Sequence, residues 1–255
     1  MLSKPIHYRF NTKFVTEELI KWITNWFEGN GKDCNAVLGM SGGKDSTICA
    51  ALLAKALGPD RVIGVIMPDV NQSYNEADEI CDYLGIHTIY APIEIVTASI
   101  HTTLSSISRQ AEQNIPPRVR MTMLYAISQS MNGRVINTCN LSENIIGYET
   151  IFGDAAGDMS PLGNLTVSEV KQIGKYLELP DKWVDKMPDD GLPNSSPDEE
   201  KIGFTYAELD KWIREGEHDI KPESLEKMKD MYYNSSFKRM PMATYSNCAL
   251  RVTCI

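Results

Sequence analysis

The sequence lacks an apolar run that approaches the ~20 residues needed to cross a lipid bilayer. Residues 1–10 include Pro5, His7 and Arg9 and hold too few apolar side chains for the core of a signal peptide. These absences argue against a helical membrane protein and against a secretory leader. We therefore expect a soluble, cytoplasmic protein with no membrane partner.

Paired cysteine motifs are also missing, because no two cysteines have the C-x-x-C spacing of a metal knuckle or a redox dithiol. In a cytosolic protein, thiols of this kind are expected to be reduced and mostly buried. The prediction covers all six: Cys34, Cys49, Cys81, Cys139, Cys248 and Cys254.

Basic residues are in the minority, with 25 Lys and Arg against 34 Asp and Glu and a net charge of -9. A surface that binds nucleic acid needs clustered cations and a favourable long-range field. We therefore expect no nucleic-acid partner. Any anionic ligand has to be held by a local site.

The chain does contain enough apolar material for one sizeable core, since 42% of its residues are hydrophobic. We expect a single compact domain over residues 1–255. Apolar residues at helical spacing predict a helix over Val15–Phe27, capped by Thr16 and ended by Gly29. A short apolar run at Ala36–Met40, a glycine turn and a helix at Ser46–Leu57 then form the opening unit of an α/β sheet.

The same alternation continues along the chain. We predict strands at Arg61–Met67, Ile86–Tyr90 and Arg134–Thr138, and helices at Asn75–Leu84, Ala98–Gln113, Pro117–Met131, Val167–Leu177, Tyr206–Arg214 and Pro222–Tyr233. Strands separated by helices predict an α/β fold with a doubly wound, mainly parallel sheet flanked by helices. The loops at 147–163 and 187–197 are long enough to be functional, and whether Gly191–Pro197 closes over a ligand is left open.

The segment GMSGGKDS, from Gly39 to Ser46, carries the strongest chemical signal. Adjacent glycines let the backbone approach a ligand, and the following helix directs unpaired N–H groups at the same point. Together they predict an anion cradle. The spacing fits neither the Walker A loop nor the G-x-G-x-x-G fingerprint. Asp45, an acid inside a phosphate cradle, is chemically reasonable as a Mg²⁺ ligand.

This S-G-G-x-D-S pattern after a buried strand resembles the loop of the ATP-pyrophosphatase (PP-loop) superfamily. The resemblance implies an adenine nucleotide alpha hydrolase-like, Rossmann-type fold and ATP as co-substrate. It also implies that the loop holds the phosphates that leave as pyrophosphate. The implied ATP-binding residues are Gly39, Met40, Ser41, Gly42, Gly43, Lys44, Asp45, Ser46 and Thr138.

The rest of the chain resembles one branch of that superfamily, the NAD synthetase family, in the order of its motifs. The matching stretches are Asn114–Tyr125, Thr138–Asp158, Ser160–Val170, Lys186–Leu192, Pro197–Tyr206 and Phe237–Met240. The resemblance implies a ligase that forms a C–N bond. Its expected reaction adenylates the nicotinate carboxylate of deamido-NAD with ATP and then amidates it with ammonia, giving NAD⁺, AMP and pyrophosphate.

Residue roles follow from the resemblance position by position. Glu143 is implied to share Mg²⁺ with Asp45, although from the residue alone it is an acid in the first turn of a helix. Three residues, Arg118, Asp158 and Lys238, match substrate-binding positions. Asp154 is our candidate for the group that binds ammonium and accepts its proton, with Asp158 second.

The chain departs from the family at Ile151 and Val167, where other members carry lysine, at Asp189, where they carry threonine, and at Phe237, where they carry histidine. The two missing lysines leave a gap in positive charge. We hypothesise that Lys186, Lys171 or Lys44 fills part of it, and we include Lys186 among the catalytic candidates.

Alternative functions remain at this stage. Another PP-loop enzyme, such as an amidating or tRNA-modifying ligase, would use the same loop, and a catalytically degenerate member would bind nucleotide without turnover. Glutamine-dependent relatives carry a further nitrilase-like domain, for which 255 residues leave no room, so free ammonia is the expected nitrogen donor. The resemblance also implies a homodimer, and the apolar positions Met121, Leu124, Tyr125, Ile127 and Met131 suit either a dimer interface or a core-facing helix.

Overall fold

A parallel β-sheet forms the centre of the molecule. The computed structural model describes residues 8–70, 72–104, 106–186 and 198–245. Within them, β1 (Asn35–Gly39), β2 (Val62–Ile66), β3 (His87–Tyr90) and β4 (Gly133–Val135) pair in parallel in the order β3-β2-β1-β4. The α/β fold with a parallel sheet is confirmed.

The order of the strands reverses the direction of winding between β1 and β4, and we call the region beyond the carboxyl ends of these two strands the crevice. The chain adds β2 and β3 on one side of β1 and then returns to place β4 on the other side. In sheets of this kind, ligands bind beyond the carboxyl ends of the strands where the winding direction reverses. The carboxyl ends of β1 and β4 are therefore the expected position of the site. A parallel bridge from Ile136 to Met159 extends the sheet beyond β4.

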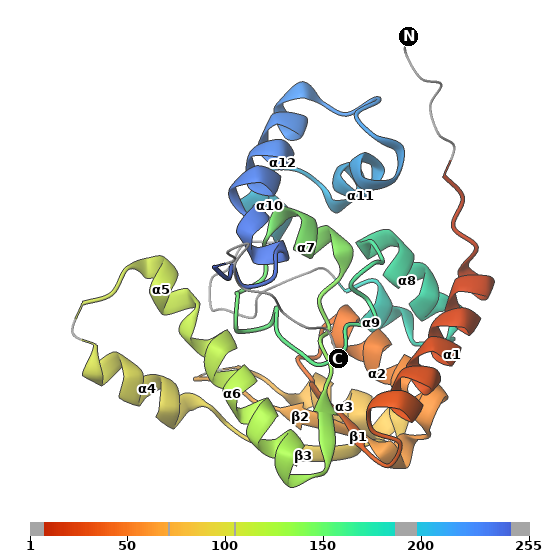
Figure 1. The fold of residues 1–255 in the computed structure, drawn as a ribbon, viewed down its shortest axis with the longest axis vertical. Helices are drawn as coiled ribbons and strands as arrows, with labels where there is room; N and C mark the ends of the chain where they lie inside the picture. The colour runs from red at the N-terminus through yellow and green to blue at the C-terminus, as the bar shows by residue number, and fades with distance from the viewer. Residues whose placement is uncertain (1–7, 71, 105, 187–197, 246–255) are drawn as a thin grey trace.

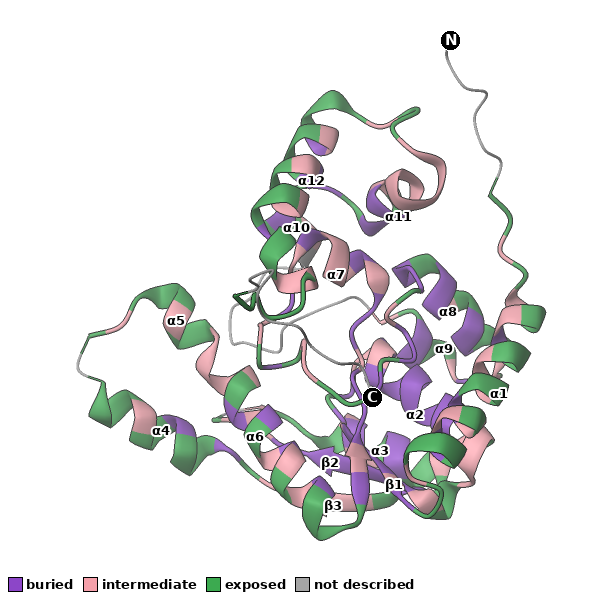
Figure 2. Cartoon of the chain, in the orientation of Figure 1, coloured by how far each residue is buried: buried purple, intermediate pink, exposed green. Residues whose placement is uncertain are grey.

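Helices cover both faces of the sheet (Figure 1). Successive strand residues point to opposite faces, so Leu38 packs in one core and Val37 in the other. The first core joins α1 (Thr12–Asn30), α2 (Lys44–Leu57), α3 (Asn75–Leu84), α8 (Val167–Tyr176) and α9 (Asp181–Val184). The second core is covered by α6 (Ile115–Ser130), with α4 (Glu94–Thr103) beside it. Figure 2 shows β1, β2 and α2 as the most buried elements.

A third apolar cluster lies in the helices at the upper end of Figure 1. It joins α7 (Leu141–Ile146), α10 (Asp198–Ile202), α11 (Tyr206–Glu215) and α12 (Pro222–Asn234) through buried side chains such as Leu209 and Met228. The remaining short elements are α5 (Arg109–Gln113), η1 (Pro59–Arg61) and η2 (Ser236–Arg239). Because α7 follows the loop after β4, this cluster is tied directly to the crevice.

Two predictions of helix limits were wrong. Asn11, not Thr16, caps α1 by accepting the N–H of Phe14 at 3.1 Å, and the helix runs past Gly29 to Asn30. The predicted helix over Ala98–Gln113 is split into α4 and α5. Ser108 causes the second start, because its hydroxyl caps α5 by accepting the N–H of Ala111 at 3.2 Å.

The apolar positions of the helix after Pro117 suited either a dimer interface or the core, and the structure shows two of them in the core. Met121 and Leu124 are buried within the chain, in the core formed with β1 and β4. Tyr125 and Ile127 are half-buried against the same core. Met131 lies just past the end of the helix and is exposed. This face of α6 therefore packs on the sheet.

The buried cysteines agree with the prediction of reduced thiols. Cys34, Cys49, Cys81 and Cys139 are buried and free. Cys248 and Cys254 lie outside the described residues. Burial raises the pKa of Cys139 well above its ordinary value, which makes its thiolate scarce at neutral pH.

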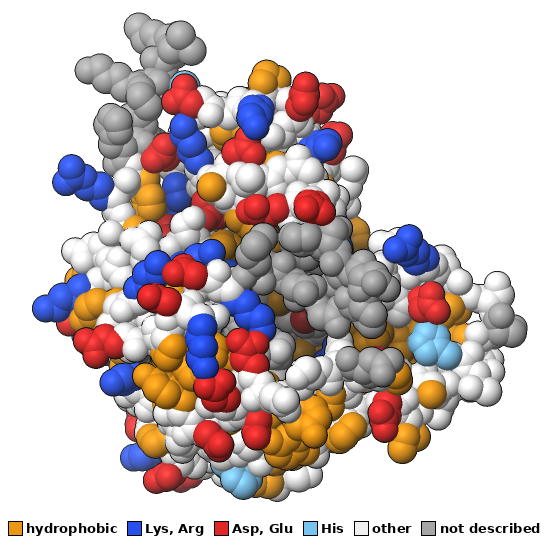
Figure 3. Space-filling model, turned by 180° about the vertical axis from the view of Figure 1, so that it is seen from behind, with side chains coloured by type: hydrophobic (Ala, Val, Ile, Leu, Met, Phe, Trp, Pro, Cys, Tyr) orange, Lys and Arg blue, Asp and Glu red, His pale blue; other side chains and the backbone are white. Residues whose placement is uncertain are grey.

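Charges of both signs are interspersed on the face drawn in Figure 3. Lysine and arginine side chains there alternate with Asp and Glu over most of the surface. No helix in the described ranges is both long and apolar enough to span a bilayer.

An ion pair between Glu169 and Arg214 joins α8 to α11. Glu169, 2% exposed, accepts hydrogen bonds from Arg214 Nε at 2.7 Å, Arg214 Nη2 at 2.6 Å and the Tyr8 hydroxyl at 2.6 Å. Burial raises the pKa of Glu169, but Arg214, Tyr8 and the Thr166 N–H outweigh it and lower the pKa overall. The pair therefore stabilises the fold above the ordinary pKa of a glutamate and loses that contribution as the pH falls through the lowered value.

We expect Glu169→Gln to lower the unfolding free energy by about 3 kcal/mol at pH 7, because it leaves Arg214 without its countercharge. The corresponding fall in Tm is roughly 6 to 12 °C. Thermal unfolding at pH 7 tests this, with Glu17→Gln as the control. Glu17 forms only an exposed pair with Lys13 at 3.9 Å, so its loss should cost less than about 0.5 kcal/mol. Equal Tm values for the two variants would contradict the assignment.

Candidate active site

The turn between β1 and α2 has the geometry of an anion-binding loop. Gly42 has a φ of 76°, and a Cβ placed there would lie 3.4 Å from the backbone nitrogen of Ala77. Ser41 Oγ accepts the Gly43 N–H at 3.2 Å and lies 3.2 Å from Ser46 Oγ. Gly43 is the N-cap of α2, so the first N–H groups of this helix open toward the turn. The turn at the carboxyl end of β1 therefore has the glycine conformation and the helix start that the predicted anion cradle requires, and anion binding there stays a prediction.

A buried ion pair lies at the start of α2. Lys44 is only 4% exposed, and its Nζ contacts Asp45 Oδ2 at 2.6 Å. The pair brings one positive and one negative charge to the base of the loop. Lys44 is thus one of the lysines that the structure places where positive charge is needed.

Asn140 joins Asp45 to Glu143 across the crevice. Its Nδ2 donates to Asp45 Oδ1 at 3.4 Å, and its backbone N–H donates to Glu143 Oε2 at 3.2 Å. Asn140 and Glu143 also form the capping box that starts α7. The loop after β1 and the loop after β4 therefore bring two carboxylates to one place.

This pair of carboxylates fits a magnesium ion. Mg²⁺ usually takes one or two protein carboxylates and completes its octahedron with substrate phosphates and water. No group of three or more His, Cys, Asp or Glu suited to a metal occurs in the described part of the chain. Most ligands would thus have to come from substrate and water, as expected beside a phosphate loop.

The carboxylates of Asp45 and Glu143 repel one another electrostatically. Burial and, second, the charge of Asp45 raise the pKa of Glu143 to about 8, against the opposing effect of Lys44. In the free protein, Glu143 therefore gives up its proton less readily than an exposed glutamate does. A bound cation would reverse this preference, because it stabilises the charged carboxylate.

Asn137 organises the loop that carries Asp154. Its Nδ2 donates to the carbonyl oxygens of Asp154 at 2.6 Å and Ala156 at 3.1 Å. Gly157 passes so close that a Cβ there would lie 2.9 Å from the backbone nitrogen of Asn137. The glycine therefore permits the 154–157 segment to lie against the end of β4.

Asp154 faces solvent at the edge of the crevice. It is exposed, and its Oδ1 accepts the Thr150 N–H at 2.9 Å. Desolvation by the surrounding protein raises its pKa. The thiol of Cys139 donates to the Asp154 carbonyl at 3.2 Å. An accessible carboxylate with a raised pKa is suited to exchanging a proton with a ligand.

Arg120 on α6 also lies in this region. Its Nε donates to the carbonyl of Met67, just past β2, at 3.0 Å, and its Nη2 donates to Gln72 Oε1 at 2.7 Å. Burial lowers its pKa, while the charges of Asp69 and Asp154 oppose that effect. Arg120 therefore adds a half-buried cation on the β2 side of the crevice.

Lys186 reaches the phosphate loop from α9. Its Nζ donates to the Gly42 carbonyl at 3.0 Å and forms an ion pair with Glu76. Of the three lysines proposed to replace the missing cations, Lys186 and Lys44 lie at the loop, whereas Lys171 is half-buried on α8. Placement at the loop supports a role for the first two.

The predicted substrate-binding residues occupy different parts of the crevice. Arg118 is exposed on α6 and donates to the Ile151 carbonyl at 3.3 Å. Lys238 lies on η2, where its Nζ donates to the carbonyls of Gly147 and Glu149, both at 2.6 Å. Arg118 on α6 and Lys238 on η2 thus both contact the 147–154 segment.

Asp158 lies beside the edge strand rather than with Asp154. Its Oδ2 accepts the Val135 N–H at 2.7 Å, and its Oδ1 accepts the Tyr125 hydroxyl at 3.3 Å. These bonds satisfy the edge of β4. Direct contact of Asp158 with substrate stays a prediction.

Comparison with known proteins decides the family. The profile of the NAD synthase family matches residues 15–242. The chain belongs to the NAD synthase family. An NH₃-dependent NAD⁺ synthetase from Methanococcus aeolicus is 37% identical over 82% of this chain and 86% of its own. An NMN synthetase from Francisella tularensis superposes with a TM-score of 0.86 at 32% identity, over 94% of this chain and 100% of its own. An NH₃-dependent NAD synthetase from Campylobacter jejuni gives 0.75 at 27% identity, over 92% and 100%.

Positions where this member of the NAD synthase family departs from the expected pattern have ordinary surroundings. Val167 is 4% exposed and packs in the third apolar cluster, at the start of α8. Ile151 is half-buried and Phe237 is 61% exposed. Thr138 is half-buried in the loop after β4. Asp189 and the Gly191–Pro197 segment lie outside the described residues.

Two residues of this NAD synthase-family site were not predicted from the sequence. Asn137 and Asn140 are 6% and 0% exposed, respectively, and bridge the segments that carry the acids. Asn137 follows the apolar run Val135–Ile136 directly, and Asn140 comes three residues later. Polar residues placed just after a buried strand, at the reversal of the winding, were the signal that could have found them.

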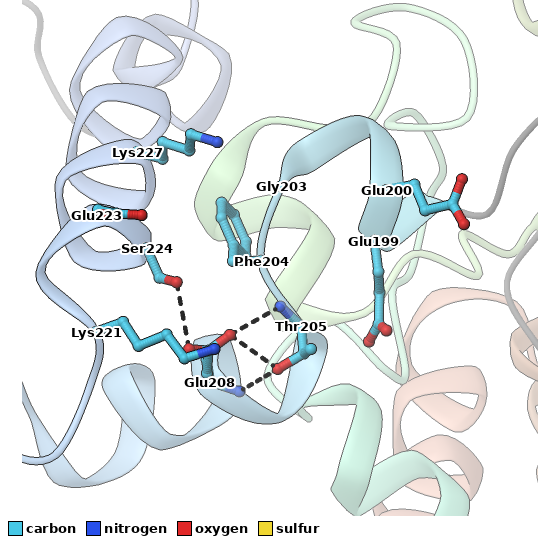
Figure 4. A pocket seen from close by; sticks show the side chains of 10 residues that line it. All are labelled: Glu199, Glu200, Gly203, Phe204, Thr205, Glu208, Lys221, Glu223, Ser224 and Lys227. Carbon is cyan, nitrogen blue, oxygen red and sulfur yellow. Dashed lines mark hydrogen bonds between the residues drawn. The ribbon is translucent and has the colours of Figure 1, made fainter.

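The cavity drawn in Figure 4 lies apart from the NAD synthase-family site. It measures about 360 Å³ and lies between the α10–α11 segment and α12. Glu208, on its lower edge in Figure 4, already accepts bonds from Thr205 N–H at 3.1 Å and Ser224 Oγ at 3.2 Å. Thr205 and Glu208 there form the capping box that starts α11.

Proposed function

We propose that this chain is an ammonia-dependent ligase that forms a C–N bond on the nicotinate carboxylate of deamido-NAD. ATP is the co-substrate, and the products are NAD⁺, AMP and pyrophosphate. One observation carries the proposal: the Ser41–Ser46 loop and the acids Asp45, Glu143 and Asp154 meet at the reversal point of a NAD synthase-family sheet.

The first step is adenylation of the carboxylate. A carboxylate resists attack because it is negatively charged and has no adequate leaving group, so its oxygen first attacks the α-phosphorus of ATP and displaces pyrophosphate. The N–H groups of Gly42, Gly43 and the start of α2 would hold the departing pyrophosphate. Mg²⁺, when held by Asp45 and Glu143, would neutralise phosphate charge. Lys186 and Lys44 would add positive charge at the same loop.

The second step replaces AMP by nitrogen. Neutral ammonia attacks the acyl carbon, and AMP leaves with the electrons of the C–O bond. Most ammonia is ammonium near neutral pH, so a carboxylate that binds the cation and accepts a proton assists the step. Asp154, accessible and with a raised pKa, is the residue we assign to this role.

A second substrate is favoured by a specific observation. The Francisella neighbour described as an NMN synthetase superposes better than the Campylobacter NAD synthetase, at TM-scores of 0.86 and 0.75. The same amidation performed on nicotinate mononucleotide would give NMN. Both substrates present the same nicotinate carboxylate to Asp154 and differ only in the adenylate half.

One assay tests the proposal and separates the two substrates. Pyrophosphate release and amide formation are measured with ATP, Mg²⁺ and ammonium, with deamido-NAD or nicotinate mononucleotide as acceptor. We expect the higher kcat/KM with deamido-NAD. A higher value with the mononucleotide would reassign the substrate. If neither acceptor is amidated, the proposed reaction is refuted. If amidation requires glutamine in place of ammonium, free ammonia is refuted as the nitrogen donor.

We also propose that the chain acts as a homodimer in the cytoplasm. Exposed apolar residues on α4, including Ile95 at 76% and Val96 at 42%, support a contact on this projecting helix (Figure 2). Free buried cysteines are consistent with a reducing compartment. Analytical ultracentrifugation of the wild type and of Ile95→Asp would test the contact, because a charge placed there should weaken association.

A further inference from the structure

Glu149 is a buried acid that the two steps above leave without a role. The residue is 5% exposed, and its Oε2 has no hydrogen-bond partner in the structure. A buried carboxylate oxygen without a donor is costly, because its lost hydration is not replaced. An atom of this kind is expected to gain a donor when the protein binds a ligand.

Glu149 lies next to the segment that carries Asp154. The next residue, Thr150, holds Asp154 through its N–H at 2.9 Å. Lys238 fixes the Glu149 backbone through the carbonyl oxygen, at 2.6 Å, rather than through the carboxylate. Burial raises the pKa of Glu149 most, and the charge of Asp154 adds to that effect, while the residue's own backbone N–H and the charges of Lys238 and Arg239 oppose it. The two acids are therefore close enough to interact electrostatically, with both cations of η2 near Glu149.

The missing partner has the chemistry of a small N–H donor. Mg²⁺ demands an octahedron of oxygens and retains water, which a single enclosed oxygen does not supply. An ammonium ion is about the size of a water molecule, carries four N–H donors and is bound more strongly by a carboxylate shielded from solvent. It is also the smallest substrate of the reaction.

We propose that Glu149 and Asp154 together form the ammonium subsite of this enzyme, with Glu149 Oε2 accepting an N–H of the ion. The inference rests on the proposed function. Ammonium gives one proton to Asp154 and becomes ammonia, whose lone pair forms the C–N bond. The C–O bond to AMP then breaks with its electrons, and a second proton leaves the nitrogen. One ammonium and one acyl adenylate thus yield the amide, AMP and two protons.

Glu149→Gln keeps the shape and removes the charge. We expect the KM for total ammonium at pH 7.5 to rise about 10- to 100-fold, the loss typical of a charge-assisted hydrogen bond. In the variant, free ammonia becomes the reacting species, so this KM should fall about tenfold per pH unit up to the pKa of ammonium. The wild-type KM should change much less, because the protein itself captures ammonium.

Two controls separate a nitrogen subsite from a structural role. Hydroxylamine is largely neutral at pH 7.5 and needs no capture as a cation, so Glu149→Gln should use it as well as the wild type does. Exchange of labelled pyrophosphate into ATP, dependent on deamido-NAD, should also be unchanged. Glu17→Gln provides the matched exposed control.

An unchanged KM for ammonium in folded Glu149→Gln would overturn the inference. An equal loss with ammonium, with hydroxylamine and in the exchange reaction would also overturn it, because the residue would then be structural. If the variant does not fold, the monovalent cation Rb⁺ is added to the wild type as a competitor of ammonium. Competitive inhibition of amide formation by Rb⁺ supports the subsite, and no inhibition counts against it. A wild type without any exchange would instead refute the proposed function.

Discussion

Asp45→Asn is expected to reduce the rate of adenylation by about 100- to 1,000-fold. The variant removes one of the two carboxylates that Asn140 joins, at 3.4 Å from its side-chain nitrogen, and so weakens the only Mg²⁺ site that we propose. It also removes the charge of one partner of the 4% exposed Lys44, the Asp45 carboxylate at 2.6 Å. Both changes act on charge beside the departing pyrophosphate.

The measurement is exchange of labelled pyrophosphate into ATP in the presence of deamido-NAD and without ammonium, over a range of Mg²⁺ concentrations. We expect the Mg²⁺ concentration for half-maximal exchange to rise as the maximal rate falls. Asp60→Asn is the matched control, because Asp60 is exposed on η1, after the far end of α2. Exchange by Asp45→Asn with wild-type rate and Mg²⁺ dependence would refute the metal assignment.

The loop could be predicted because its chemistry is local. Two glycines, a short apolar strand before them and a helix after them are enough to predict the turn between Gly39 and Ser46. The same holds for α3, whose limits Asn75 and Leu84 agree with the prediction. Local signals also misled, because a competing serine, Ser108, started a new helix inside a segment with continuous helical spacing.

The second half of the site depends on contacts that no local pattern contains. Asn140 reaches Asp45 across 95 positions of sequence, and Lys186 reaches Gly42 across 144. The family resemblance supplied Glu143 and Asp154, but it gave no role to Glu149, Asn137 or Asn140. The two asparagines matter because of the long-range hydrogen bonds they make, and Glu149 because its buried Oε2 lacks a partner, and all of these are properties of the folded chain. It is therefore easier to predict from the sequence which segments lie together than which atoms form hydrogen bonds.

Charge crowding in the crevice links stability to function. Glu143, Glu149 and Asp154 all have pKa values raised first by burial, so each would be easier to keep neutral in a free protein than charged. Cations in the reaction, Mg²⁺ and ammonium, reverse that preference. The site is therefore less stable without its ligands than a site with neutral residues would be, a cost typical of catalytic regions.

Glu143→Gln should accordingly stabilise the metal-free protein at high pH while it weakens activity. Wild-type Glu143 has a pKa raised to about 8 in the fold, whereas in the unfolded chain it titrates near its ordinary value of 4.5. Between these two values the unfolded chain has lost the proton that the folded protein still holds, so folding stability falls as the pH rises from about 4.5 to about 8. The glutamine carries no charge at any pH and can still accept the Asn140 N–H that Glu143 accepts at 3.2 Å.

We expect the variant and the wild type to have equal Tm values at pH 4.5 and the variant to exceed the wild type by about 5 to 10 °C at pH 8.5, a difference of a few kcal/mol. Thermal unfolding with EDTA at the two pH values measures this. Mg²⁺ and ATP, both at saturating concentrations, should reduce the difference in Tm between the variant and the wild type at pH 8.5. The reason is that these ligands bind the charged wild-type site more tightly and so stabilise it more. Parallel Tm curves across this pH range would mean that Glu143 does not bear the raised pKa, and the argument that the empty site stores unfavourable charge would fail with it.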